Sequence, residues 1–250
     1  MLLHDLTALV TGAGSGLGRA IALAYAREGA RVVLSDITEE GARETMRLAA
    51  EATPRAECIF VRADASDPAA HEALVQAAVD RFGALHVACN NAGIGGELNP
   101  VGDLSVAGWR KVIEVNLSGV FYAMHAQIPR MLAAGGGAIV NMSSVLGQVG
   151  TSGVAGYAAA KHGVVGLTQT AAIDYAARGI RINAVGPGYI DTPLLGSLPA
   201  AARDGLVALH PIGRLGRAEE VAELVVWLSS DRASFVTGAY YPIDGGYLAR

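Results

Sequence analysis

The sequence predicts an α/β fold: a doubly wound parallel sheet of seven strands with helices on both faces. Short β-branched runs alternate with helical stretches along all 250 residues, which is typical of parallel sheets whose strands are joined by crossover helices. Most of these runs are apolar on both faces, as in a sheet that is covered on either side. No repeat, linker or change of composition interrupts the pattern. We therefore expect one domain over residues 1–250.

Seven runs are the expected strands, and each is short, apolar and bounded by turn residues. They are Ala8–Thr11, Arg31–Ser35, Cys58–Arg62, Val87–Asn90, Ala138–Met142, Arg181–Val185 and Tyr240–Ile243. Helix starts are recognisable between them: Thr38 precedes two glutamates, and Asp67 precedes a proline, both typical of N-caps. Ligands of such sheets bind beyond the carboxyl ends of the strands, so the residues that follow each strand are the candidates for function.

Composition and charge exclude several classes of protein. Hydrophobic residues make up 52% of the chain and charged residues 17%, which excludes intrinsic disorder. The net charge of −4 argues against nucleic acids and anionic membranes as partners. No apolar run approaches the ~20 residues of a membrane span, and the first residues do not resemble a signal peptide, so we expect a cytoplasmic protein. Cys58 and Cys89 lie inside expected strands and are interpreted as core residues, with no metal site.

The first strand leads into a glycine-rich turn, with glycines at positions 12, 14, 16 and 18. Glycines allow backbone N–H groups to approach a pyrophosphate, and the N-terminus of the following helix adds partial positive charge. The spacing is one residue out of phase with the standard dinucleotide fingerprint, and no Lys-Ser/Thr follows Gly18 as in a Walker loop. A plain flexible turn is the alternative, but the strand–turn–helix context favours a phosphate cradle.

Polar residues follow the next three strands. Asp36 comes 18 positions after Gly18, where a carboxylate can accept the ribose hydroxyls of an adenosine and would repel a 2′-phosphate. No basic residue stands at Ser15 or Ile37, so NAD is favoured over NADP. Asp64 is either a partner for the adenine amino group or a turn residue. The segment from Asn90 to Gly93 is small and polar, as a backbone lying against a ribose requires.

The fifth strand is followed by Ser144 and then by a helix that carries Tyr157 and Lys161 on one face. An ammonium ~4 Å from a phenol, at an effective dielectric constant of ~20, favours the phenolate by ~4 kcal/mol. We therefore expect Lys161 to lower the pKa of Tyr157 toward neutrality, with desolvation opposing this. Such a tyrosine can exchange a proton with an alcohol or ketone, and Ser144 can hydrogen-bond the substrate oxygen.

Taken together, these motifs resemble the short-chain dehydrogenase/reductase family over essentially the whole chain. The matching segments are Thr11–Gly18, Asn90–Gly93, Ser144 with Tyr157 and Lys161, and Pro187-Gly188 with Thr192. The resemblance implies a Rossmann fold, homotetramers that pair through long central helices, and a catalytic serine thirteen residues before the tyrosine, which selects Ser144 over Ser143. It also implies a fourth catalytic residue, Asn116, which breaks its helix and holds a water that links Lys161 to solvent.

The resemblance further implies a set of contacts with NAD. They fall on the glycine-rich turn, the ends of strands two to four, the catalytic pair and the start of the last long loop. The residues are Gly12, Ser15, Gly16, Leu17, Gly18, Asp36, Asp64, Ala65, Asn90, Ala92, Gly93, Tyr157, Lys161, Pro187, Gly188, Ile190 and Thr192.

The segment from Pro187 to about Gly213 shows no clear periodicity, and a loop of this length is usually functional. We expect residues 188–213 to form a lid over the substrate. The lid contains no lysine or arginine before Arg203, which disfavours substrates anchored by a carboxylate or phosphate. The expected pocket residues are mostly apolar: Ile94, Gly95, Gly96, Val145, Leu146, Val154, Tyr189, Leu194 and Leu195.

These features predict an NAD-dependent enzyme that interconverts a secondary alcohol and a medium-sized, mostly apolar ketone. Two other substrates remain open: a 3-oxoacyl thioester on acyl carrier protein, and a sugar or polyol. The loop before strand five has no basic residue for docking such a carrier, although Arg178 could contribute. A non-catalytic dinucleotide sensor is a further alternative, but it would be expected to have lost Ser144, Tyr157 or Lys161.

Overall fold

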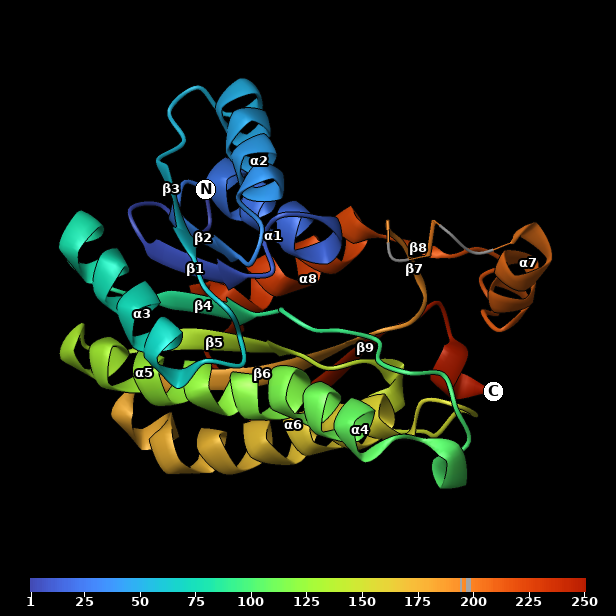
Figure 1. The fold of residues 1–250 in the computed structure, drawn as a ribbon. Helices are drawn as coiled ribbons and strands as arrows, with labels where there is room; N and C mark the ends of the chain where they lie inside the picture. Colours follow the sequence, from blue (N-terminus) through green and yellow to red (C-terminus); the bar gives the residue numbers. More distant parts are fainter. Residues whose placement is uncertain (194, 197–198) are drawn as a thin grey trace.

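Seven parallel strands form one twisted sheet in the order β3-β2-β1-β4-β5-β6-β9 (Figure 1). The computed structural model describes residues 1–193, 195–196 and 199–250. The strands are β1 (Thr7–Thr11), β2 (Arg31–Asp36), β3 (Cys58–Arg62), β4 (Val87–Asn90), β5 (Gly137–Met142), β6 (Ile180–Pro187) and β9 (Tyr240–Ile243). All seven predicted strands are confirmed, within a residue or two at their ends. The predicted doubly wound α/β fold is therefore correct.

Helices cover both faces of the sheet (Figure 1). One face carries α1 (Gly16–Arg27), α2 (Glu39–Ala52) and α8 (Ala218–Ser229), and the other carries α3 (Pro68–Phe82), α4 (Val106–Ile113), α5 (Gly119–Ala133) and α6 (Ala155–Tyr175). A single wide π-turn, Glu114–Ser118, joins α4 to α5. Because both faces are covered, the strands are apolar on both sides, as the sequence predicts.

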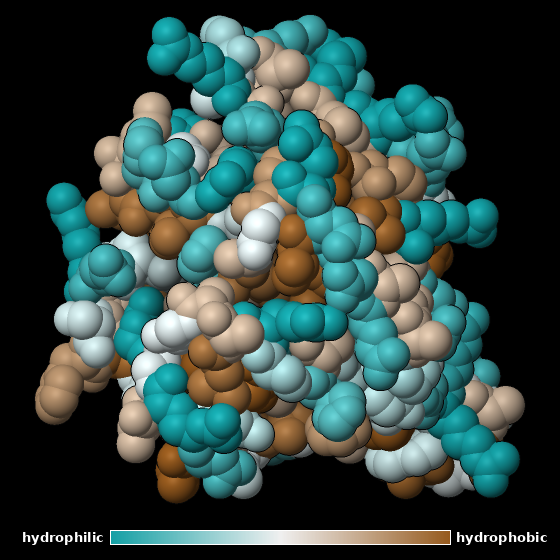
Figure 2. Space-filling model, turned by 90° about the vertical axis from the view of Figure 1, so that its left-hand side faces the viewer, coloured by the Kyte–Doolittle hydropathy of each residue, from teal (hydrophilic) through white to brown (hydrophobic). Residues whose placement is uncertain are grey.

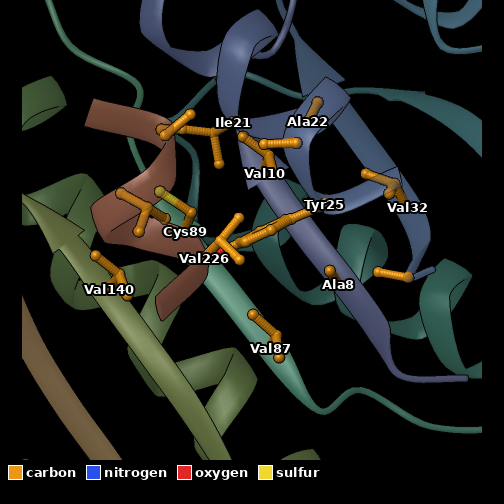
Figure 3. Close-up of a cluster of buried hydrophobic side chains, with 14 of the residues drawn as sticks. Ala8, Val10, Ile21, Ala22, Tyr25, Val32, Val87, Cys89, Val140 and Val226 are labelled. Carbon is orange, nitrogen blue, oxygen red and sulfur yellow. The ribbon is translucent and has the colours of Figure 1, made fainter. Parts of the chain in front are cut away.

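The core on the α1 and α8 side is made of small and β-branched side chains that pack around Tyr25 (Figure 3). Tyr25 is fully buried, and its hydroxyl lies 2.7 Å from Ser229 Oγ on α8, so its one polar atom is satisfied. Cys89 lies in the same cluster. Burial raises the pKa of the Cys89 thiol to about 12, which agrees with its interpretation as a core residue.

The two predicted N-caps differ in their chemistry. Asp67 Oδ1 accepts the Ala69 N–H at 3.0 Å, with Pro68 in the first helical position of α3, as predicted. Thr38 stands at the N-cap position of α2, but its side chain makes no capping hydrogen bond and instead donates to Asp36 Oδ1 at 3.0 Å. Asp36 therefore competes for the hydroxyl that would otherwise cap the helix.

The segment expected to be a long irregular lid is partly regular. It contains a two-residue strand, β7 (Ile190–Asp191), and a helix, α7 (Ala200–Ala208). Parallel to β7 runs β8 (Gly216–Arg217), just beyond the lid. Alanine favours helix even where no hydrophobic periodicity is present, which is why the three alanines after Pro199 start a helix that periodicity did not reveal. Leu194, a predicted pocket residue, lies outside the described residues.

The helix α7 and the C-terminus lie on the right-hand side of the molecule in Figure 1, with α7 to the right of β7 and β8 and the C-terminus below them. Figure 2 shows the opposite side, where hydrophilic side chains occupy most of the rim and hydrophobic ones lie mainly between them. Among the described residues, no helix combines the length and the apolar character needed to cross a bilayer.

Candidate active site

A cavity of about 1010 Å³ opens at the carboxyl ends of the central strands. Its size suits a large ligand, or two ligands side by side. Nearly all of the predicted site residues line it: Gly12, Ser15, Gly16, Leu17, Gly18, Asp36, Asp64, Ala65, Ala92, Gly93, Ile94, Gly95, Gly96, Ser144, Val145, Leu146, Val154, Tyr157, Lys161, Pro187, Gly188, Tyr189, Ile190, Thr192 and Leu195. Residues that were predicted from separate strand ends thus line one continuous cavity.

The glycine-rich turn has a backbone that other residues would not adopt. Gly12 has φ +65°, in the left-handed region that favours glycine. A Cβ on Gly18 would lie 2.0 Å from the Gly12 carbonyl oxygen, so α1 can pack this closely on the turn only with glycine there. The turn is therefore a defined cradle at the N-terminus of α1, and the alternative of a merely flexible turn is disfavoured.

Asp36 ties the end of β2 to the glycine-rich turn. Its Oδ2 accepts the Gly14 N–H at 2.9 Å, and its Oδ1 accepts the backbone N–H and the hydroxyl of Thr38, each at 3.0 Å. A carboxylate has about four acceptor positions, so acceptor capacity remains for a ligand hydroxyl in the cavity. The Arg19 guanidinium is engaged by the carbonyl oxygens of Gly14 and Gly41.

Asp64 is a turn residue that also lines the cavity, and its contact with the adenine amino group stays a prediction. Asp64 Oδ1 accepts the backbone N–H and the hydroxyl of Ser66 at 2.9 and 2.7 Å, which makes it a turn residue. These hydrogen bonds lower the pKa of the Asp64 carboxyl. The neighbouring Ala65 carbonyl bonds the ring of His71 at 3.0 Å, which holds this corner of the cavity in place.

Asn90 is not among the residues that line the cavity, and the contact of its backbone with the coenzyme stays a prediction. Its side chain is 2% exposed and donates to Gln127 Oε1 and Asn141 Oδ1 at 3.2 and 2.9 Å, so it holds a buried polar network under the cavity floor. The next residue was missed: Asn91 lines the cavity and donates to the Thr11 carbonyl at 2.9 Å. Because successive strand residues face opposite sides, neighbouring asparagines have different surroundings.

Lys161 and Tyr157 extend from α6 into the cavity, beneath the end of β5. Lys161 is 3% exposed, and its Nζ donates to the Met142 carbonyl at 2.8 Å and lies 5.4 Å from the centre of the Tyr157 ring. Burial lowers the pKa of the Lys161 ammonium to about 8. The two side chains lie close together, as their i, i+4 spacing predicts.

The expected direction of the Tyr157 pKa is wrong for the protein without ligand. Burial raises the pKa of the phenol, and contact with the Ser144 hydroxyl opposes this rise. The sequence predicts too large an effect of the Lys161 ammonium on the pKa of Tyr157. The burial that disfavours the phenolate also disfavours the ammonium and lowers the pKa of Lys161. The Ser144 hydroxyl, rather than the Lys161 ammonium, is the group that opposes this rise in the pKa of Tyr157.

The two neighbouring serines have separate roles. The Ser143 hydroxyl donates to the Lys161 carbonyl at 2.9 Å, so it ties β5 to α6. The Ser144 hydroxyl oxygen accepts the Leu146 N–H at 3.2 Å, which leaves its proton available to an oxygen in the cavity. The Ser144 carbonyl in turn accepts the Tyr240 hydroxyl at 2.8 Å. The geometry thus favours Ser144 over Ser143 as the residue that meets a substrate.

Asn116 lies in the π-turn and is fully buried. Its side chain accepts the Ile94 N–H and donates to the Ile94 carbonyl, each at 2.8 Å. A Cβ on Gly93 would lie 3.2 Å from Asn116 Oδ1 and 3.7 Å from Lys161 Nζ, so Asn116 is close to Lys161 although it does not line the cavity. Its side chain holds the pocket residue Ile94 in place.

Several other lining residues were not predicted as site residues, among them Leu98, Thr151 and Pro193. Leu98 and Thr151 lie in loops without a motif, and only the fold brings them to the cavity. Pro193 adjoins the predicted contact Thr192, so its position was the one available signal.

Comparison with known proteins identifies the family. A family model described as enoyl-(acyl carrier protein) reductase matches residues 12–248. The cyclohexanol dehydrogenase of Acinetobacter sp. (strain SE19) is 52% identical, over 99% of this chain and 96% of its own. The cis-4-hydroxycyclohexanecarboxylate dehydrogenase of Sinomonas cyclohexanicum is 50% identical, over 97% and 96%. A crystal structure of levodione reductase has a TM-score of 0.96 at 43% identity, covering 99% of both chains. The chain therefore belongs to the short-chain dehydrogenase/reductase family, among its alcohol dehydrogenases and ketoreductases.

Proposed function

We propose that the protein is an NAD-dependent dehydrogenase of cyclic secondary alcohols, working reversibly on the corresponding ketones. The observation that carries the proposal is that Ser144, Tyr157 and Lys161 line the same cavity as Asp36 and the glycine-rich turn. A proton-exchanging group and a dinucleotide cradle in one cavity suit hydride-transfer chemistry.

The residues of the cavity fit a nicotinamide dinucleotide. The turn and the N-terminus of α1 form a cradle for the pyrophosphate, and Asp36 has acceptor capacity for a ribose hydroxyl. A 2′-phosphate would meet that carboxylate, and the nearby Arg19 is already engaged by backbone carbonyls, so NAD is preferred over NADP. Lys161 and Tyr157 would hold the second ribose, and Gly188, Ile190 and Thr192 would face the carboxamide.

The proposed mechanism removes a hydride and a proton from the alcohol. A bound nicotinamide coenzyme in its oxidised form would supply the acceptor for the hydride that leaves the carbinol carbon. Tyr157, as phenolate, takes the hydroxyl proton, and in ketone reduction it returns that proton. Ser144 donates a hydrogen bond to the substrate oxygen. Lys161, when protonated, stabilises the phenolate, and Asn116 would take part in proton exchange with solvent.

The lining of the cavity supports a neutral, mostly apolar substrate. Among the described lining residues, Lys111 and Lys161 are the only lysines or arginines, so a substrate carboxylate would have few cationic partners. Val145, Leu146 and Leu98 supply apolar surface. The names of two relatives specify six-membered carbocyclic alcohols, and cyclohexanol is the simplest uncharged compound of that class.

An absorbance assay of NADH tests this function. Cyclohexanol with NAD⁺ is compared with a 3-hydroxyacyl thioester, with a sugar alcohol and with NADP⁺ in place of NAD⁺. We expect the highest kcat/KM for cyclohexanol with NAD⁺. A higher value for the thioester would assign the protein to acyl thioester chemistry, and turnover of none of the compounds, with coenzyme still bound, would favour the sensor.

We also propose that the chain forms a homotetramer. Large apolar side chains are exposed on the central helices: Phe121 on α5 is 49% exposed and Ile173 on α6 is 81% exposed. An assembly that pairs through these two helices would cover both side chains. Light scattering after size exclusion should give four times the chain mass of 25.6 kDa, and a monomer would contradict the proposal.

A further inference from the structure

Tyr189 is a wall residue of the cavity whose backbone is held on both sides. Its carbonyl accepts the Gly216 N–H at 3.0 Å, next to the pairing of β7 with β8. Its own N–H donates to Nε2 of His210 at 3.1 Å. Tyr189 stands between Gly188 and Ile190, which also line the cavity. The position of this segment therefore depends on a side chain 21 residues further along the chain.

His210 can make its contacts in only one neutral tautomer. Its Nδ1 lies 2.8 Å from the Leu206 carbonyl in α7, and a carbonyl can only accept, so Nδ1 carries the proton. Its Nε2 faces the Tyr189 N–H, which can only donate, so Nε2 is the acceptor. The His210 side chain thus joins helix α7 to the wall of the cavity through two directional hydrogen bonds.

The space around His210 is built for this ring. The residue is 4% exposed, and a Cβ on Gly188 would lie 2.7 Å from its Nε2. Its ring lies 5.9 Å from the Tyr189 ring at a nearly perpendicular angle of 83°, and 5.7 Å from the Tyr247 ring, distances typical of aromatic contacts. Other side chains would lose either the fit or the hydrogen bonds.

We propose that His210 is a positioning residue that sets the substrate selectivity of the cavity. It does not line the cavity itself. By fixing the backbone and ring of Tyr189 and the end of α7, it fixes the wall against which the ring of the alcohol packs. The kinetic part of this inference rests on the proposed function, whereas the clamp on Tyr189 does not.

Two substitutions separate the hydrogen bonds from the packing. His210→Phe keeps an aromatic ring and removes both bonds, and His210→Gln keeps an oxygen acceptor for the Tyr189 N–H. His86→Phe is the matched control, because Nδ1 of His86 also accepts a backbone N–H, that of Thr7 at 3.0 Å, at the start of β1. All variants are compared for KM and kcat with cyclohexanol, for NAD⁺ affinity and for hydrogen exchange of the Tyr189 segment.

We expect His210→Phe to raise the KM of cyclohexanol about five- to tenfold, with kcat and NAD⁺ affinity within about twofold. This is the effect of losing the bond to the Tyr189 N–H, because of the two lost bonds it is the one made directly to the cavity wall. Exchange at Tyr189 should accelerate. His210→Gln should restore KM to within about threefold, and His86→Phe should leave KM and the exchange at Tyr189 unchanged.

Equal rates of hydrogen exchange at Tyr189 in the wild type and in His210→Phe would overturn the inference that His210 holds Tyr189. Faster exchange with an unchanged KM, or a rise in KM that His86→Phe reproduces, would overturn the role in selectivity. If the wild type does not oxidise cyclohexanol, the proposed function fails, and the exchange measurement alone still decides whether His210 holds Tyr189.

Discussion

The two walls of the cavity are built in different ways. On the β5–α6 side, Ser144 and Lys161 are 9% and 3% exposed, and both are tied to buried backbone. On the lid side, β7 and β8 have only two residues each, and the ion pair between Arg203 and Asp191 is 39% and 51% exposed. Buried contacts restrain atoms more than exposed ones do. The residues proposed for the chemistry therefore lie on the buried wall. In the lid, the buried His210 holds Tyr189, and only the outer contacts, such as the pair of Arg203 and Asp191, are exposed.

The largest expected effect is on the buried wall. Tyr157→Phe removes the proton-exchanging hydroxyl and should lower kcat at least about 10³-fold, within the usual range for general acid–base groups. NAD⁺ affinity should stay within about threefold, because the ring remains. Steady-state kinetics and coenzyme titration measure both. Tyr175→Phe, on the same helix, is the control, and a near-normal kcat in Tyr157→Phe would refute the proposed mechanism.

Substitution of Lys161 tests whether the buried ammonium that the proposed reaction needs lowers the stability of the fold. Its pKa of about 8 in the folded protein lies below the unfolded value of ~10.4, so burial of the ammonium is unfavourable below pH ~8 and the penalty disappears as the pH rises through ~10.4. Lys161→Met should abolish most turnover. It should also raise the free energy of unfolding at pH 7 by about 2 kcal/mol. Removing the buried ammonium relieves a desolvation cost of ~3 kcal/mol, and losing its hydrogen bond to the Met142 carbonyl costs ~1 kcal/mol.

Denaturant unfolding at pH 7 and pH 10 measures this effect on stability. The gain should shrink at pH 10, where wild-type Lys161 is already neutral in the folded protein. A Lys161→Met protein that is less stable than wild type at pH 7 would show that the buried ammonium is well compensated.

Asp36 lines the cavity at the end of β2, which is separated from β5 by two strands. Asp36→Ala should lower the preference for NAD⁺ over NADP⁺ in kcat/KM by about 10- to 100-fold, because like-charge contact disfavours the 2′-phosphate. Asp64→Ala is the matched control and should change both coenzymes equally, since they share the adenine. A wild-type preference for NADPH would show that the account of Asp36 is wrong.

Tyr240 tests how much a single hydrogen bond contributes to the position of Ser144 in the buried wall. Its hydroxyl donates to the Ser144 carbonyl, and a Cβ on Gly186 would lie 2.0 Å from that hydroxyl oxygen. Tyr240→Phe should lower kcat about three- to tenfold with little change in KM. Tyr241→Phe is the control in the same kinetic assay. Equal kcat values would mean that Ser144 holds its position without Tyr240.

The smallest effect is expected on the lid. Arg203→Gln breaks an exposed ion pair with Asp191, of a kind that contributes at most about 1 kcal/mol. kcat/KM should change by less than about threefold, and the change should vanish in high salt. A large effect that persists in salt would show that the lid is as rigid as the buried wall, and the contrast between the walls would fail.

The main fold was predictable because strand and helix signals are local. Apolar runs located all seven strands, and the residues after them located most of the cavity. The helix α7 was not predictable from hydrophobic periodicity, because it has no buried residue and so presents no core-facing stripe. The buried surroundings of the Asn90 side chain were not predictable for a related reason: the sequence does not show which face of the sheet a strand-end residue occupies.

By itself, the sequence determined where the seven strands lie along the chain, the glycine-rich turn and the grouping of Ser144, Tyr157 and Lys161. These depend on short-range patterns and on spacing along one helix. Only the tertiary structure decided the direction of the Tyr157 pKa, the tautomer of His210 and the pairing of Tyr240 with Ser144. Those properties depend on burial and on partners that are distant in the chain. Both arise only when the folded protein removes a group from water and brings a remote atom within hydrogen-bond distance.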